Sequence, residues 1–115
     1  MRHASSAQRA FAGVPIQFLG ANAGVMFTGS TLLTGSEQEW RTTYDVNVLG
    51  VARTLRAFVP VMARQREHSV VEITASAAGV QFGGAGPYGT SKVSLAAATS
   101  LRRRPHPRCT LLTRH

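Results

Sequence analysis

Tyr88 and Lys92 are the residues of this sequence whose types and spacing point most directly to chemistry. They stand four positions apart and follow Pro87, which suits the first turn of a helix because it has no N–H that needs a partner there. On one face of such a helix, the ammonium would lie beside the phenol and favour its ionised form, which suits proton transfer near neutral pH. Ser76, twelve residues before Tyr88 at the end of an apolar run, would add a second hydroxyl. The pattern predicts a proton-transfer site, with an exposed Tyr–Lys pair and a strand-end serine as the alternatives.

Two apolar segments read as strands that would support this site. Residues 14–19 form a short strand pattern with a proline near its start, where a strand tolerates it. Residues 69–75 are nearly all apolar or β-branched, which predicts a strand buried on both faces, as in a parallel sheet. Residues 20–24 are small and turn-forming, so a ligand could approach their backbone closely. Residues 109–113 could add a third strand.

Helical patterns lie between and after these strands. The capping box Ser36–Glu39 starts a helix in which apolar residues recur at helical spacing, with Asn47 beside the apolar stripe. Pro60 is expected to kink or shorten the last turn of this helix. A further alanine-rich helix is expected over residues 87–103. This alternation of helix and strand predicts an α/β fold.

Composition bounds the class of protein. At 115 residues the chain is at most one small domain. Its net charge of +8 comes mostly from five arginines in residues 102–115, a segment without acidic or aromatic residues, so nucleic-acid binding is not expected. The single Cys109 fits a reducing compartment, and no apolar run reaches the roughly 18 residues that suggest a membrane span. We therefore expect a cytoplasmic protein without membrane contact. The four histidines have no ligand-like spacing, so no metal site is expected.

Four motifs follow one another as they do in the short-chain dehydrogenases/reductases, and the chain resembles the central part of that family. Residues 21–24, Ala-Asn-Ala-Gly, resemble the family's Asn-Asn-Ala-Gly segment, with alanine in place of the first asparagine. Asp45-Val46-Asn47 resembles the motif that carries the family's helix asparagine, Ser76 follows a strand, and Tyr88–Lys92 matches Tyr-x-x-x-Lys. Such a Tyr–Lys pair arises often by chance, whereas all four motifs in order are specific.

The resemblance implies an α/β fold in which a partial Rossmann-type parallel sheet is flanked by helices. It is strongest over residues 14–101, so we expect a partial domain over 1–101 and a divergent basic tail over 102–115. The family's N-terminal strands, with the glycine-rich turn that seats the cofactor pyrophosphate, have no counterpart in the sequence, and the glycines of 83–86 fall in the expected substrate loop. We therefore expect this chain to bind NAD(P) weakly or not at all.

The resemblance also implies a role for each motif residue. Tyr88 would be the general acid/base, and Lys92 would favour the ionised tyrosine and hydrogen-bond the nicotinamide ribose of NAD or NADP. Ser76 would hold and polarise the substrate carbonyl, and Asn47 would hold a water that links Lys92 to solvent. The loop 77–86 would form part of the substrate wall. The implied catalytic residues are Asn47, Ser76, Tyr88 and Lys92, and the implied cofactor-binding residues are Ala21, Asn22, Ala23, Gly24, Tyr88 and Lys92.

The implied activity is reversible hydride transfer between NAD(P) and a small carbonyl/alcohol substrate, impaired in this incomplete chain. The alternative is a non-catalytic module that docks on full-length subunits of the same family. Helices equivalent to 46–64 and 87–103 pack at subunit interfaces in that family, so the same surfaces would also support a homo-oligomer.

Overall fold

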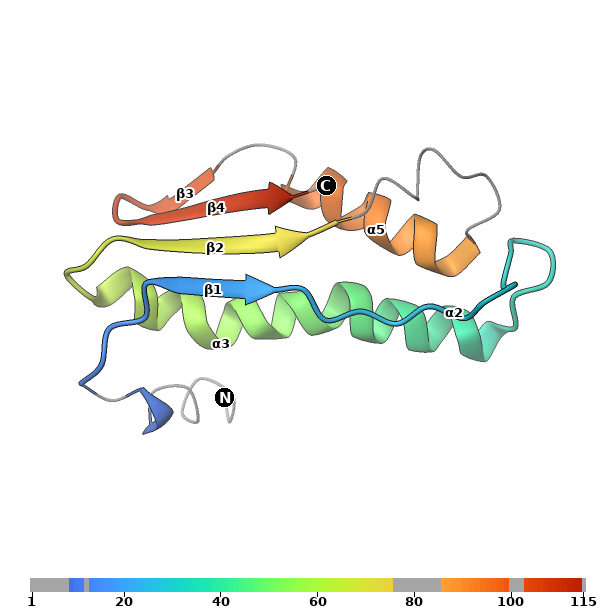
Figure 1. Ribbon diagram of the computed structural model, residues 1–115, viewed down its shortest axis with the longest axis horizontal. Coiled ribbons are helices and arrows are strands. Elements are labelled where there is room, and N and C mark those ends of the chain that lie inside the picture. The colour runs from blue at the N-terminus through green and yellow to red at the C-terminus, as the bar shows by residue number, and fades with distance from the viewer. Residues whose placement is uncertain (1–8, 12, 76–85, 100–102, 115) are drawn as a thin grey trace.

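The computed structural model describes residues 9–11, 13–75, 86–99 and 103–114, and these build one sheet with helices against it (Figure 1). The strands are β1 (Phe18–Ala21), β2 (Ser69–Thr74), β3 (Arg103–His106) and β4 (Cys109–Arg114), in the spatial order β1-β2-β4-β3. β1 and β4 both pair with β2 in parallel, and β3 pairs with β4 antiparallel. The predicted α/β architecture with a partial parallel sheet is confirmed.

One helical run, residues 37–64, connects β1 to β2. It comprises the α-helix α2 (Glu37–Tyr44), the wider π-helical turn η1 (Asp45–Leu49) and the α-helix α3 (Gly50–Arg64). The predicted capping box starts it, because the Ser36 hydroxyl accepts from the Glu39 N–H while the Glu39 carboxylate accepts from the Ser36 N–H. Pro60 lies inside α3, which continues to Arg64, so Pro60 does not shorten this helix. The other predicted effect of Pro60, a kink in the helix, stays a prediction.

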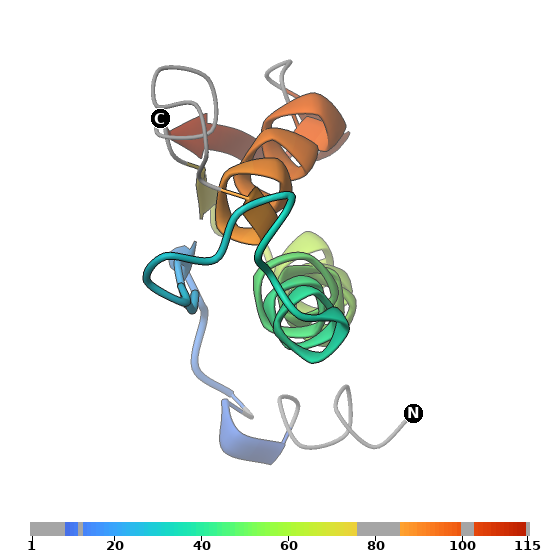
Figure 2. The ribbon, with the colours of Figure 1, turned by 90° about the vertical axis from the view of Figure 1, so that its right-hand side faces the viewer.

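Both helical elements that flank the sheet lie on the same side of it (Figure 2). α5 (Gly86–Thr99) packs beside the 37–64 run, and the buried core between helices and strands includes Val51, Met62, Val71 and Ile73. The 37–64 run is also long and apolar enough to cross a membrane by length and composition alone. A helix that packs against a sheet satisfies the same two criteria, so this property is weak support for a membrane span.

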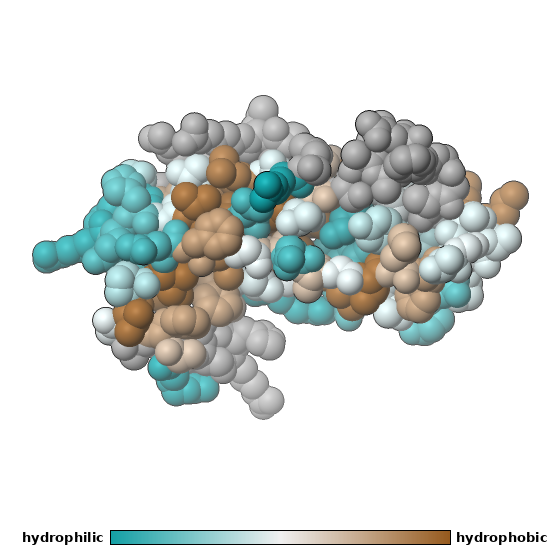
Figure 3. Space-filling view, in the orientation of Figure 1, coloured by the Kyte–Doolittle hydropathy of each residue, from teal (hydrophilic) through white to brown (hydrophobic). Residues whose placement is uncertain are grey.

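The prediction that the second strand is buried on both faces is wrong. Ser69, Val71 and Ile73 of β2 point toward the helices and are buried, whereas the alternate residues are only half-buried. No described helix covers this second face, which is the face toward the viewer in Figure 3 and shows apolar side chains among polar ones. This second face of β2 therefore carries surface side chains such as Glu72, which forms an ion pair with Arg114 at 3.4 Å.

The first strand begins later than the predicted residues 14–19. β1 starts at Phe18, and Ile16, two residues before it, bonds to a side chain instead of to β2. The Gln65 side chain, just beyond α3, accepts from the Ile16 N–H at 2.9 Å and donates to the Ile16 carbonyl. A side-chain amide thus takes the place of a strand neighbour at this position.

The C-terminal part differs from the prediction in one respect and agrees in another. α5 is described as far as Thr99, and Arg103, where the helix was expected to end, lies in β3. Pro105 disfavours a helical conformation of the residue before it, which also lies in β3. The third strand suggested at 109–113 is confirmed as β4, which joins the sheet through residues 109–114.

Candidate active site

Lys92 lies in α5 with its side chain almost wholly buried, at 4% exposure. Its Nζ donates to the carbonyl of Thr74, the last residue of β2, at 3.3 Å. The same Nζ lies 5.8 Å from the centre of the Tyr88 ring, so the predicted proximity of ammonium and phenol is observed. Burial lowers the pKa of Lys92 below its ordinary value of 10.5, because desolvation disfavours the charged ammonium.

Asn47 is fully buried in the π-helical turn η1. Its Oδ1 accepts from the Val25 N–H at 2.8 Å, and its Nδ2 donates to the Val25 carbonyl at 3.0 Å. These two bonds fix the segment that follows β1 against the helical run. The second Nδ2 hydrogen is donated to Ser91. The resemblance implies that Asn47 holds a water, and of the two side-chain atoms only Oδ1 is left to bind that water, as an acceptor.

The Ala-Asn-Ala-Gly segment runs past these two groups. A Cβ atom on Gly24 would lie 3.2 Å from Lys92 Nζ and 3.3 Å from Asn47 Oδ1, so the position suits glycine. Ala21 is buried, whereas residues 22–24 are exposed. The structure therefore brings Asn47, Lys92, Tyr88 and this segment to the same end of β1 and β2.

The predicted Ser76 lies outside the described residues. β2 ends at Thr74, and the structure describes Ala75 as buried, with its N–H donating to the Arg114 carbonyl at 2.7 Å. The expected substrate loop 77–86 also falls outside the description, apart from Gly86. The geometry of the two hydroxyls thus remains a prediction.

Sequence reasoning missed three contributors to this site. Val25 supplies the backbone that Asn47 holds, Thr74 supplies the carbonyl that Lys92 binds, and Ser91 bonds to Asn47. Backbone partners leave no trace in residue type. Ser91 did carry a signal, because a serine three residues after Tyr88 lies on the same face of the helix as that tyrosine.

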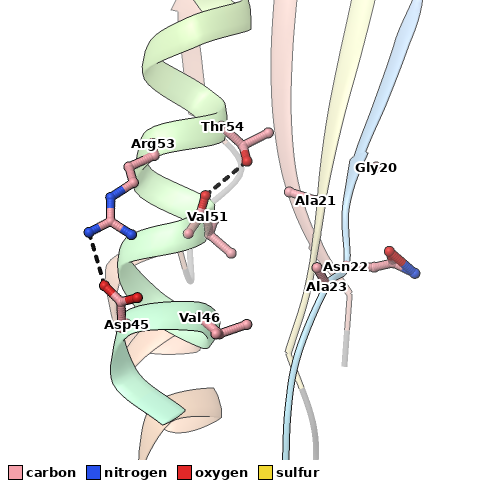
Figure 4. Close-up of a pocket in the computed structure, with 10 residues that line it drawn as sticks. Gly20, Ala21, Asn22, Ala23, Asp45, Val46, Val51, Arg53 and Thr54 are labelled. Atoms are coloured by element: carbon pink, nitrogen blue, oxygen red, sulfur yellow. Dashed lines mark hydrogen bonds and ion pairs between the residues drawn. The ribbon is translucent and has the colours of Figure 1, made fainter. Parts of the chain in front are cut away.

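A cleft of about 370 Å³ lies between the end of β1 and the helical run (Figure 4). Figure 4 shows Ala21 directed toward the helix and Asn22 directed away from it, as successive strand residues alternate. Asp45 and Arg53 form an ion pair of 2.9 Å at the helical wall. Tyr88 and Lys92 do not line this cleft. The Ala-Asn-Ala-Gly segment connects the two places, because residues 21–23 line the cleft and Gly24 lies beside Lys92. The lining residues are Gly20, Ala21, Asn22, Ala23, Asp45, Val46, Gly50, Val51, Arg53 and Thr54.

The described residues suit one part of a dinucleotide cofactor. A buried ammonium beside a glycine without a side chain offers a donor to ribose hydroxyls, and the small residues 21–24 let a ligand approach the backbone. A pyrophosphate favours the free N–H groups of a helix N-terminus. Among the described residues, no helix N-terminus lines the cleft, and at the start of α2 the N–H groups of Ser36 and Glu39 already have partners. The fit is therefore to the ribose end.

Comparison with known proteins agrees with this fold. The family model for short chain dehydrogenases matches residues 2–108. A rabbit (Oryctolagus cuniculus) protein, dehydrogenase/reductase SDR family member 4, is 36% identical over 84 residues, which are 73% of this chain and 32% of that protein. A short-chain dehydrogenase/reductase of Burkholderia phymatum, solved in complex with NAD, is 35% identical with a TM-score of 0.75, covering 96% of this chain and 41% of that one.

A third similar protein is an alcohol dehydrogenase of the archaeon Thermococcus sibiricus, solved in complex with 5-hydroxy-NADP. It is 28% identical with a TM-score of 0.71, and the match covers 84% of this chain and 40% of that one. The partial α/β sheet of this chain is the fold that it shares with these two solved structures. The chain belongs to the short-chain dehydrogenase family, and it spans between 32% and 41% of these three relatives.

Proposed function

We propose that this chain carries the proton-transfer half of an NAD(P)-dependent dehydrogenase site that interconverts a small carbonyl and an alcohol. The observation that carries the proposal is the buried Lys92 ammonium, held by the Thr74 carbonyl beside the Tyr88 ring. Burying a charged ammonium is unfavourable unless a partner group compensates for it. An ammonium in this position therefore indicates a function that a packed apolar side chain would not serve. Asn47, Ser76, Tyr88 and Lys92 are the proposed catalytic residues.

Each proposed residue has a distinct task. Tyr88 passes a proton to the substrate oxygen or takes it away, and Lys92 stabilises the negative charge that the phenol oxygen then carries. Ser76 donates a hydrogen bond to the substrate oxygen. Asn47 keeps the segment after β1 in place through Val25. NAD(P), when bound, supplies or accepts the hydride, and the proposed residues that hold its ribose end are Ala21, Asn22, Ala23, Gly24, Tyr88 and Lys92.

The proposal leaves NAD and NADP as alternatives. The Burkholderia relative is solved with NAD and the Thermococcus relative with an NADP derivative, and this chain matches less than half of each. Because the described residues provide no pyrophosphate cradle, we expect the isolated chain to bind either cofactor weakly.

A titration of the purified chain with NADH and with NADPH, followed by cofactor fluorescence, tests this expectation. We expect dissociation constants well above the micromolar range, and micromolar binding would overturn the expected impairment.

Turnover with NADPH and a panel of small aldehydes and ketones tests the catalytic part. Tyr88→Phe removes only the hydroxyl, so it should reduce any turnover by about 10²–10⁴-fold. Turnover that survives Tyr88→Phe contradicts the assignment.

A second candidate function is docking on full-length subunits of the same family. It is favoured by exposed apolar side chains on the two helical elements that flank the sheet, the 37–64 run and α5. These side chains are Leu49, at 49% exposure, and Val93, at 38%. Co-purification of the tagged chain with an untagged full-length short-chain dehydrogenase tests it. We expect Leu49→Lys and Val93→Lys to abolish co-purification and Leu33→Lys, in a loop outside both helices, to leave it intact. Equal retention of all three variants would exclude docking through these helices.

A further inference from the structure

Ser91 connects two of the proposed catalytic positions, although it is not one of the four motif residues. It lies in α5 and is fully buried. Its Oγ donates to the carbonyl of Tyr88 at 2.7 Å and accepts from Asn47 Nδ2 at 3.0 Å. Tyr88 lies on the same helix, whereas Asn47 lies 44 residues away in η1. One hydroxyl therefore joins the start of α5 to the π-helical turn.

The hydrogens in this cluster can be assigned one by one. The Ser91 hydroxyl has a single hydrogen, and the Tyr88 carbonyl can only accept, so that hydrogen points to Tyr88. Toward Asn47, the same oxygen is then an acceptor only. Asn47 Nδ2 has two hydrogens, one for Ser91 Oγ and one for the Val25 carbonyl. Every hydrogen in the cluster is used.

This assignment admits only one orientation of the Asn47 amide. A reversed amide would place Oδ1 against the Val25 carbonyl and against a serine oxygen whose hydrogen points elsewhere. It would also place the NH₂ group against the Val25 N–H, so that donor would face donor. In the observed orientation, Oδ1 lies on the Gly24 side, where a Cβ atom on Gly24 would meet both Oδ1 and Lys92 Nζ.

We propose that Ser91 is a positioning residue, which fixes the Asn47 amide and thereby sets the segment 22–25 relative to Tyr88 and Lys92. The relevance of this role to catalysis rests on the proposed function, whereas the hydrogen-bond chain itself does not. Removal of the Ser91 oxygen leaves one buried Nδ2 hydrogen without an acceptor, which is unfavourable enough to loosen the amide.

The same helix offers a matched control. Thr90 is exposed, and its Oγ1 bonds back to the carbonyls of Gly86 and Pro87, as Ser91 does to Tyr88. Both hydroxyls therefore make the local bond that serines and threonines form in helices. Only Ser91 also accepts from another element in the described structure, so a difference between the two substitutions isolates the bond to Asn47.

The test is a nuclear magnetic resonance measurement on the ¹⁵N-labelled full chain, read at the Asn47 side-chain NH₂ and the Val25 backbone N–H. In the wild type, we expect both Nδ2 hydrogens to exchange slowly with solvent. Ser91→Ala should make them exchange about tenfold faster or more and should shift the Val25 signal. Ser91→Cys fills the space with a weak acceptor and should resemble Ser91→Ala, and Thr90→Ala should leave both signals unchanged.

Unchanged Asn47 exchange in Ser91→Ala would overturn the proposal, and so would restoration of slow exchange by Ser91→Cys, because filling space would then suffice. If both variants fail to fold, the wild type alone decides. Asn47 hydrogens that exchange as fast as those of a free amide would exclude the locked orientation, and slow exchange of both would support it. None of these readouts involves NAD(P), so a chain that binds no cofactor leaves this result intact and affects only the proposed function.

Discussion

Lys92 is the only lysine of the sequence, which makes its buried ammonium directly measurable. A chain labelled with ¹³C-lysine should give one lysine side-chain signal, and its titration yields the pKa of Lys92. We expect this pKa to lie below 10.5, because burial disfavours the charged form. A value at or above 10.5 would show that the ammonium is solvated or carries a compensating negative partner.

The same burial predicts how stability depends on pH. Between the lowered folded-state pKa and the unfolded value of 10.5, the unfolded chain binds more protons at Lys92 than the folded chain does. The free energy of unfolding therefore gains a contribution from Lys92 that rises with pH across this window. Urea unfolding gives the free energy of unfolding of Lys92→Met and of the wild type at each pH. The value for the variant minus the value for the wild type should fall from pH 7 to pH 10. A constant difference would contradict the lowered pKa.

Thr43 presents a buried hydroxyl whose Oγ1 has no hydrogen-bond partner in the described structure. Thr43→Val keeps the shape and removes the unpaired hydroxyl, so we expect the free energy of unfolding to rise by about 1 kcal/mol. Thr42→Val is the control, because Thr42 Oγ1 accepts from Gln38 and is only half-buried. Urea unfolding followed by the fluorescence of the single Trp40 measures both. A loss of stability in Thr43→Val would mean that the hydroxyl has a partner.

At the scale of elements, the 37–64 run combines a regular α-helix with one wide turn that places Asn47. Gly50 closes this turn with helical backbone angles, and a Cβ there would lie 3.6 Å from the Asp45 carbonyl, an ordinary contact. We expect Gly50→Ala to stabilise the chain by roughly 0.5–1 kcal/mol, since glycine is unfavourable inside a helix.

Gly24→Ala is the contrasting substitution. Its Cβ would approach Lys92 Nζ and Asn47 Oδ1 closely, at 3.2 and 3.3 Å, so one of these two fixed groups must move. We expect a lower midpoint of urea unfolding for Gly24→Ala and a higher one for Gly50→Ala. If Gly24→Ala is neutral, the segment after β1 is not held as tightly as the structure indicates.

The sequence allowed most elements to be predicted because their signals are local. The capping box at Ser36–Glu39 and the apolar run of β2 are examples, and so is the proline in the first turn of α5. The start of β1 was not predictable, because the local pattern carries no sign that Ile16 bonds to the Gln65 amide 49 positions away. At the site, the Tyr–Lys pair follows from helical spacing, whereas the bonds of Asn47 to Val25 and Ser91 arise only when separate elements meet.

At the scale of the molecule, β1 is an edge of the described sheet, and Phe18 at this edge is 59% exposed. An uncovered edge strand with an apolar residue favours association between chains. We expect light scattering of the wild type to rise with concentration and Phe18→Lys to reduce this rise. Leu33→Lys removes a side chain that is 93% exposed but lies outside the sheet, so it serves as the control. If only Leu33→Lys reduces scattering, the loop rather than the edge drives association.

The two side-chain amides that hold β1 have a consequence for the order in which the molecule opens. Gln65, just beyond the helical run, bonds to Ile16, and Asn47, within the run, bonds to Val25, so two side-chain amides close the segment 16–65 on itself. The remaining described elements, β2, β4, β3 and α5, join this unit through the pairing of β1 with β2, through the core that α3 shares with β2, and through the packing of α5 beside η1, which includes the bond between Asn47 and Ser91.

Partial unfolding should follow that boundary. Native-state hydrogen exchange should therefore show the amides of α3 opening as one group and those of α5 as another. A single opening energy for both helices would contradict two units. Since Asn47 belongs to one unit and Tyr88 and Lys92 to the other, the proposed catalytic set is assembled only while the two units are closed on each other.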